Sequence, residues 1–76
     1  MTTFETIANI VAEQLHVDVA SITPTTNIKT DIKADSLDIA TILFAIEDEF
    51  NIEVPTEQAI ALTTMQEMVD LIDSLK

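Results

Sequence analysis

The chain has 76 residues, of which 47% are hydrophobic, and its fourteen Asp and Glu against three Lys give a net charge of -11. This charge repels phosphate backbones and anionic lipid surfaces, so it excludes nucleic acid as a ligand and predicts partners with basic surfaces. No run reaches the roughly 20 apolar residues that cross a bilayer, and the sequence lacks the features of a secretion signal. We therefore expect one cytoplasmic domain over residues 1–76, monomeric and without membrane insertion.

A first helix is predicted from about Thr3 to Leu15 or His16. Thr2 and Glu5 have the spacing of a capping box, in which each side chain binds the backbone amide of the other residue. Apolar residues then recur at steps of three and four, which places them on one face of a helix. This face is formed by Phe4, Ile7, Ala8, Val11, Ala12 and Leu15.

The segment 17–35 is polar and irregular, and its Pro24 and Asn27 favour turns, so it is predicted to form a long loop. The chain contains no Gly, so its turns should close with Asn, Asp, Thr and Pro instead. Isolated apolar residues should hold the loop against the helices, namely Val19, Ile22, Ile28 and Ile32.

A second helix should begin after Asp35, whose carboxylate can cap the first amides, and run to about Phe50. Asp38 adds a negative charge in the first turn, where the helix dipole favours it. The stripe that faces the core consists of Ile39, Ile42, Leu43, Ile46 and Phe50. A neighbouring stripe mixes apolar and acidic residues, namely Leu37, Ala40, Thr41, Phe44, Glu47 and Asp48.

Two further helices are predicted in the last third of the chain. Pro55 keeps residues 52–55 extended, and a short third helix follows over about Thr56–Leu62. The fourth helix opens with Thr64 and Glu67 as a second capping box. It should bury Met65, Met68, Val69, Ile72 and Leu75. The predicted fold class is all-α, with a long first loop and a short third helix.

Residue types that usually carry catalysis are scarce. His16 is the only histidine and no nucleophile elbow surrounds Ser36, so we expect no catalytic residue and no enzyme. A favourable cation at the end of the first helix is the simpler interpretation of His16. Without Gly the chain cannot form a calcium loop of the EF-hand type, so we expect no metal site. Its carboxylate clusters can still attract divalent ions weakly.

Ser36 stands out because it follows a capping carboxylate at the first position of the second helix. The amides at a helix N-terminus are unpaired and partly positive, so a phosphate ester on this hydroxyl would be well tolerated. Local geometry alone favours a plainer interpretation, in which Ser36 is an ordinary first-turn residue.

The segments Ala34–Asp38 (ADSLD) and Ile46–Pro55 (IEDEFNIEVP) closely resemble the acyl carrier proteins of fatty-acid synthesis. Chain length, acidic balance and a final helix opened by TTM at 63–65 extend the likeness over nearly the whole chain. The resemblance implies a four-helix bundle whose interior can shelter an acyl chain. It also implies that Ser36 carries 4'-phosphopantetheine, which a separate carrier protein synthase transfers from coenzyme A. The thiol of this group then holds acyl groups as thioesters.

The same resemblance implies that the second helix docks onto basic patches of acyl-processing enzymes. Fatty acid biosynthesis is the leading pathway, and a specialised polyketide, peptidyl or D-alanyl pathway is an alternative. Two other classes stay open, an acidic interaction module without a covalent role for Ser36 and a sensor of divalent ions. The expected docking residues are Asp35, Leu37, Asp38, Thr41, Phe44, Glu47 and Asp48.

Several positions depart from the pattern of this family. Lys33 stands where the family usually has Gly before its Asp-Ser-Leu motif, and Thr41 stands where Glu is frequent. Ile39 and Phe44 make the second helix more apolar. These departures raise the question of whether the carrier serves general fatty-acid synthesis or a narrower pathway with its own partners.

Overall fold

The computed structural model describes residues 2–76 and contains four α-helices, as predicted. They are α1 (Thr3–Leu15), α2 (Ser36–Phe50), α3 (Thr56–Ile60) and α4 (Met65–Leu75), and a 3-10 helix, η1 (Val19–Ser21), follows α1. Within the described residues, β-structure is limited to one isolated antiparallel bridge between Asn27 and Thr64. The prediction of an all-α fold with a long first loop and a short third helix is confirmed.

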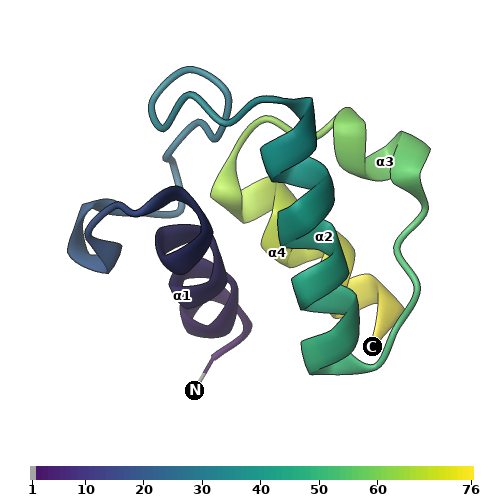
Figure 1. Ribbon diagram of the computed structural model, residues 1–76. Coiled ribbons are helices and arrows are strands. Elements are labelled where there is room, and N and C mark those ends of the chain that lie inside the picture. The colour runs from purple at the N-terminus through teal and green to yellow at the C-terminus, as the bar shows by residue number, and fades with distance from the viewer. Residues whose placement is uncertain (1) are drawn as a thin grey trace.

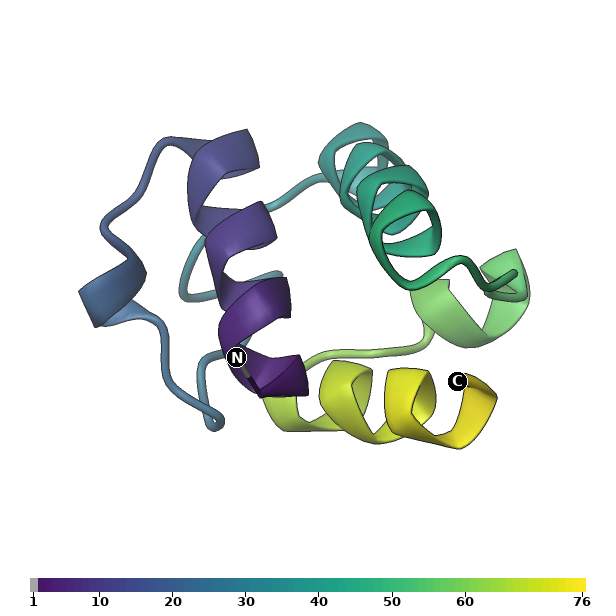
Figure 2. The ribbon, with the colours of Figure 1, turned by 90° about the horizontal axis from the view of Figure 1, so that it is seen from below.

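The three longer helices enclose an aliphatic core. α1 packs against α2 and α4, while α3 packs against α2. Figures 1 and 2 show α3 beside α2, and η1 on the side of α1 that faces away from α2. Each fully buried aliphatic side chain stabilises the fold by about 1.5–3 kcal/mol relative to its exposed state. The largest fully buried side chains are Ile7, Val11, Ile28, Ile42, Ile46, Met65, Met68 and Ile72.

The first and last helices begin with the capping boxes that their sequences predict. The Glu5 amide donates to Thr2 Oγ1 at 3.1 Å, and the Thr2 amide donates to Glu5 Oε1 at 3.0 Å. The Glu67 amide donates to Thr64 Oγ1 at 3.2 Å, and the Thr64 amide donates to Glu67 Oε1 at 3.0 Å. Hydrogen bonds to this carboxylate, above all from the Thr63 hydroxyl, lower the pKa of Glu67 from 4.5 to about 2.

Three details differ from the prediction. α3 ends at Ile60 rather than Leu62, because the chain turns at Ala61 to enter the connection to α4. Leu75 is exposed, since its place in the last turn of α4 lies beyond Ile72, the last buried residue of that helix. Val19 is also exposed, because it lies on η1 at the outer side of α1 instead of entering the core.

Three residues with side chains adopt the left-handed backbone conformation that Gly usually takes. They are His16 (φ 57°), Lys33 (φ 61°) and Asn51 (φ 55°). His16 and Asn51 end α1 and α2, and their amides donate to the carbonyls of Ala12 and Glu47. The conformation costs a residue with a Cβ atom roughly 1–2 kcal/mol. Asn51 agrees with the prediction for turns, whereas His16 and Lys33 show that this prediction was too narrow. A role for the charge of His16 stays a prediction.

The start of α1 is tied to the end of α4, at the end of the molecule opposite to the start of α2 (Figure 1). The Thr3 hydroxyl donates to Asp73 Oδ1 at 2.7 Å, and Lys76 Nζ donates to Thr3 Oγ1 at 2.6 Å. Lys76 Nζ also lies 3.3 Å from Asp73 Oδ1 and 5.5 Å from the centre of the Phe50 ring. The hydrogen bond from Thr3, followed by that from Lys76, lowers the pKa of the Asp73 carboxyl.

Candidate functional site

Ser36 is exposed at the first position of α2. The preceding residue, Asp35, accepts the Asp38 amide on Oδ1 at 2.8 Å, while Asp38 Oδ2 accepts the Asp35 amide at 3.3 Å. The two carboxylates therefore form a third capping box, of which the sequence predicted only the Asp35 half. Because Asp35 caps the amide of Asp38, the amides of Ser36 and Leu37 are left without an acceptor inside the helix, at its positive end.

The loop before Ser36 is fixed to the connection between α3 and α4. The Ile28 amide donates to the Thr63 carbonyl at 2.8 Å, and the Ala34 amide donates to the Ile28 carbonyl at 3.0 Å. Both Ile28 and Ala34 are buried, as the sequence predicted for Ile28. Lys33, directly before Ala34, is exposed and makes the left-handed turn. Although Ser36 follows a long loop, hydrogen bonds and buried side chains therefore hold the backbone that leads to it.

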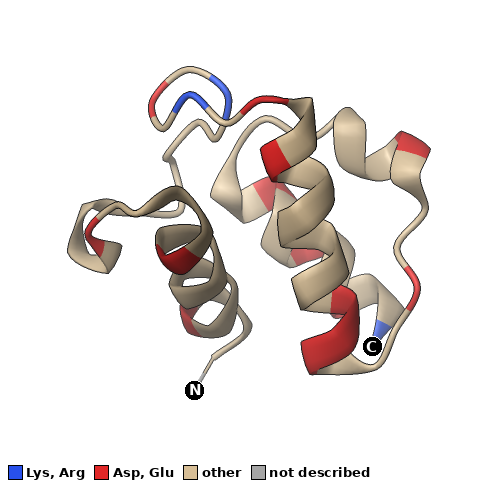
Figure 3. Ribbon diagram, in the orientation of Figure 1, with Lys and Arg blue, Asp and Glu red and all other residues tan. Residues whose placement is uncertain are grey.

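The predicted docking face of α2 carries two large exposed apolar side chains. Leu37 is 73% exposed and Phe44 is 70% exposed. Asp35 and Asp48 are exposed near the two ends of the helix. Figure 3 shows acidic residues at both ends of α2, and the loop before α2 carries Lys29 and Lys33. This face offers apolar contacts between two regions of negative charge.

Three other residues predicted for docking, Asp38, Thr41 and Glu47, are half-buried and use their side chains within the molecule. The carboxylate of Asp38 belongs to the capping box described above. The Thr41 hydroxyl donates to the Leu37 carbonyl at 3.0 Å. Glu47 Oε2 accepts the Val54 amide at 2.8 Å. A change at any of these residues therefore alters local bonds of the fold as well as the surface.

A cavity of about 170 Å³ lies between α2 and the segment that leads into α3. Ala40, Phe44 and Glu47 recur at helical spacing in the sequence, but this pattern does not predict a cavity. Its signal in the sequence is Ala40, whose small side chain stands among bulky ones in α2. The cavity is lined by Ala40, Leu43, Phe44, Glu47, Val54 and Thr56.

Ile60, the last residue of α3, was also missed. Its side chain is 49% exposed, whereas the neighbouring Ala59 is buried. The helix predicted over 56–62 is consistent with this difference, because the side chains of successive residues in a helix point in directions about 100° apart. Ile60 therefore adds an exposed apolar side chain to the α3 side of the molecule.

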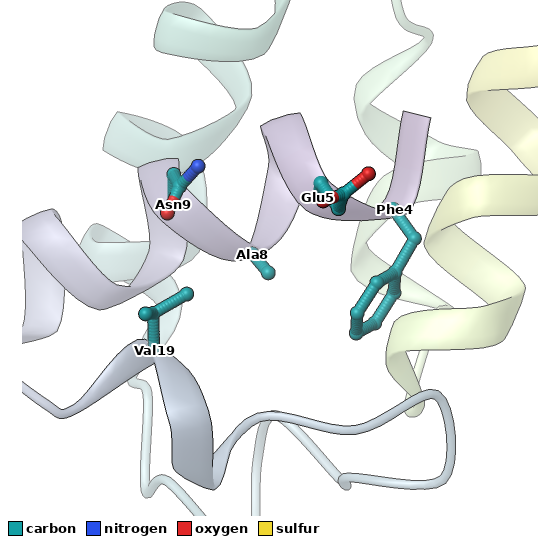
Figure 4. Close-up of a pocket in the computed structure, with 5 residues that line it drawn as sticks. All are labelled: Phe4, Glu5, Ala8, Asn9 and Val19. Carbon is teal, nitrogen blue, oxygen red and sulfur yellow. The ribbon is translucent and has the colours of Figure 1, made fainter. Parts of the chain in front are cut away.

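A second cavity, of about 270 Å³, lies between α1 and η1. Figure 4 shows the side chains of Phe4, Ala8 and Val19 directed toward it, with Glu5 and Asn9 at its edge. α1 lies between η1 and α2 in both ribbon views (Figures 1 and 2). This cavity is therefore not part of the region around Ser36.

Other kinds of site find little support in residues 2–76. No group of three His, Asp or Glu side chains in this part of the chain lies close enough together to hold a metal ion. None of the helices described above combines the length and the apolar character that a membrane span requires.

Comparison with known families matches residues 5–72 to the family described as phosphopantetheine attachment site. The chain is 42% identical over 76 residues to an acyl carrier protein of Helicobacter pylori strain J99, covering 100% of this chain and 97% of that protein. It is 38% identical to an acyl carrier protein of Helicobacter hepaticus, with both chains covered completely.

Two solved structures share the fold. The acyl carrier protein of Enterococcus faecalis matches with a TM-score of 0.82 and 30% identity over the full length of both chains. The apo doublet acyl carrier protein from prodigiosin biosynthesis matches with a TM-score of 0.84 over 97% of this chain and 36% of that one. Its identity of 18% supports the fold alone.

The family match defines a carrier domain whose covalent cofactor is 4'-phosphopantetheine. Together with the full-length relatives, it shows that the chain belongs to the acyl carrier proteins. Members of this family carry acyl groups between synthases and acyl-processing enzymes and are not themselves catalysts. The resemblance seen in the sequence is confirmed.

Proposed function

We propose that 4'-phosphopantetheine is attached to Ser36 and that the chain carries acyl thioesters in fatty acid biosynthesis. The observation that carries this proposal is an exposed hydroxyl at the first position of α2, directly after the capping residue Asp35. The hydroxyl lies within the residues matched by the phosphopantetheine family. The likeness of ADSLD and IEDEFNIEVP to the carriers of fatty-acid synthesis supports the pathway.

The surroundings of Ser36 fit a phosphodiester. Its exposure lets a modifying enzyme reach the hydroxyl, and the partly positive start of α2 favours a negative group there. The capping box of Asp35 and Asp38 ties together the backbone on both sides of Ser36. When bound, the cofactor supplies a thiol on a flexible arm, which forms thioesters with acyl groups.

The experiment that tests this role is incubation of the unmodified protein with coenzyme A and a carrier protein synthase, followed by intact mass spectrometry. We expect the wild type to gain one phosphopantetheine unit and Ser36→Ala to gain none. Ser74→Ala is the matched control, because this serine is exposed near the end of α4, and it should be modified like the wild type. A Ser36→Ala protein that still gains the unit, or a wild type that never does, contradicts the proposal.

The pathway needs a separate measurement. Mass spectrometry of the protein isolated from its native cells should find fatty acyl intermediates on the arm. Polyketide, aminoacyl or D-alanyl groups would instead assign it to a specialised pathway. If cells tolerate Ser36→Ala and the arm is never found, the chain is an acidic interaction module.

The exposed face of α2 is proposed as the surface that partner enzymes bind. Leu37 and Phe44 supply apolar contact area, and the carboxylates near them attract basic patches on the partner. Phe44→Ala should lower the kcat/KM of the carrier protein synthase by about ten-fold, the size typical of a central apolar contact. Val19→Ala, which truncates an exposed apolar residue on η1, should leave it unchanged. Equal effects of the two substitutions would exclude α2 as the docking surface.

The same proposal includes a monomeric, cytoplasmic protein whose residues 1–76 form one domain. The net charge of -11 supports the monomer, because two copies repel each other. Light scattering at moderate salt should give the mass of one chain.

A further inference from the structure

α3 has the weakest support of the four helices. It contains five residues, its N-cap residue Pro55 makes no side-chain hydrogen bond, and Ala59 is its one buried residue. Isolated helices of this length are not stable in water, so α3 depends on bonds from its neighbours.

Two charged side chains bind the backbone at the two ends of this segment. Glu47 on α2 accepts the Val54 amide at 2.8 Å, two residues before α3 begins. Lys29 in the long loop donates from Nζ to the carbonyl of Ile60, the last residue of α3, at 2.7 Å. A carbonyl at a helix C-terminus lacks an intrahelical partner and is partly negative, so an ammonium group suits it in both respects.

The position of Lys29 is fixed by its own turn. Asn27 Oδ1 accepts the amides of Lys29 at 2.9 Å and of Thr30 at 3.0 Å. The adjacent Ile28 is buried, and its amide is bonded to the Thr63 carbonyl. The backbone of Lys29 is therefore held to the connection between α3 and α4, and its side chain adds a second link, to α3 itself.

The cavity beside α2 adjoins the segment that these two bonds hold. Val54 and Thr56 form its wall on the α3 side, and Ala40 and Phe44 form part of the opposite wall. A longer guest gains room in this cavity when α3 moves away from α2. Because Lys29 joins the end of α3 to the loop that leads into α2, its bond opposes such a movement.

We propose that Lys29 is a positioning residue that holds α3 against α2 and so limits the length of acyl chain that the cavity admits. The inference rests on the proposed function, since the guest is the acyl group carried on Ser36. Lys33 provides a natural contrast, because it is an exposed lysine of the same loop whose side chain makes no hydrogen bond within residues 2–76.

Amide hydrogen exchange in the unmodified protein tests the bond without any cofactor. Lys29→Met should speed the exchange of α3 amides about five- to ten-fold, which is the loss expected for one ordinary, solvent-exposed hydrogen bond. α4 amides should be unaffected. Lys33→Met removes the same charge and should leave α3 unchanged, and Lys29→Arg should restore slow exchange because it keeps a donor. Unchanged α3 exchange in Lys29→Met overturns the proposal.

Acyl length supplies the second test. Each protein is loaded with a butyryl or an octanoyl arm from the corresponding acyl coenzyme A, and the melting temperatures of the two forms are compared. The rise in melting temperature from the butyryl to the octanoyl form should be larger in Lys29→Met than in wild type and Lys33→Met. Without the bond from Lys29, less free energy is needed to move α3 away from α2. Equal gains in all three proteins contradict a role in length selection. If no protein accepts an arm, the proposed function fails, whereas the exchange test still decides the role of Lys29.

Discussion

α3 and α4 are neighbours in the chain, yet they are held in different ways. α4 begins with a complete capping box and buries four residues in the core, Met65, Met68, Val69 and Ile72. α3 lacks a side-chain cap and buries only Ala59. α4 thus combines a cap from its own sequence with a buried face, whereas α3 has no such cap, and side chains of other elements, Glu47 and Lys29, bind the backbone just before it and at its last residue.

This contrast suits a carrier. α1, α2 and α4 supply most of the buried core residues, whereas α3 supplies only Ala59 and lies beside the cavity proposed for the acyl chain. A helix with few buried contacts can move without disturbing the rest of the core.

Core truncation should show the largest difference between the two helices. Ile72→Ala should lower the free energy of unfolding by about 2–5 kcal/mol, because it leaves a cavity at a fully buried position of α4. Ile60→Ala is the matched control on α3 and should cost within about 0.5 kcal/mol, since its side chain is half exposed. Urea unfolding followed by circular dichroism measures both. Similar costs would mean that α3 is part of the cooperative core.

Amide exchange in the unsubstituted protein should give the next largest difference. The amides of α4 near Ile72 are expected to exchange through global unfolding, and those of α3 through a local opening of lower free energy. Their protection factors should therefore differ by at least about ten-fold, which corresponds to 1.4 kcal/mol. If both helices exchanged at one rate under native conditions, α3 would not open separately.

Acid should weaken α4 through its capping box. Because folding lowers the pKa of Glu67 from 4.5 to about 2, its carboxylate stabilises the fold above pH 4.5, and this contribution is lost as the pH falls toward 2. The difference in melting temperature between wild type and Glu67→Gln should accordingly be constant above pH 5 and shrink below pH 4.5. Glu57→Gln controls for the change of charge, because it alters the first turn of α3. A constant difference down to pH 2 would show that the cap does not depend on the ionised carboxylate.

The smallest effect is expected in the loop that supports α3. Lys33 has a φ of 61°, so Lys33→Gly removes the cost of a Cβ atom in the left-handed region, partly offset by the greater entropy of Gly in the unfolded chain. A net stabilisation of up to about 1 kcal/mol is expected. Lys33→Met keeps the Cβ atom while removing the same charge, so it should not stabilise the protein in this way. Equal stabilisation by both would assign the effect to charge.

Sequence reasoning located α1 and α4 because their boundaries are encoded locally. Each of these helices begins with a capping box of two residues three positions apart, Thr2 with Glu5 and Thr64 with Glu67, and such a pair marks the start of a helix. The candidate attachment residue could be found for the same reason, since Asp35 caps the helix that begins with Ser36.

The remaining features depend on contacts between distant residues. The bond from Lys29 to Ile60 joins residues 31 positions apart, and no local pattern predicts which backbone carbonyl a lysine will meet. The early end of α3, the exposure of Leu75 and the cavity beside Ala40 arise in the same way from how the helices pack. The family resemblance supplied the idea of an internal shelter, but only the packed structure locates its walls.

The link between Thr3, Asp73 and Lys76 has a practical consequence for anchoring the protein. The start of α1 and the end of α4 meet at one pole, while α2 begins at the other (Figure 1). A solid support or fluorescent reporter joined at the start of α1 or at the end of α4 would leave Ser36 at the far end of the molecule from the attachment point. A layer of molecules immobilised in this manner would present the hydroxyl of every copy to enzymes in the overlying solution.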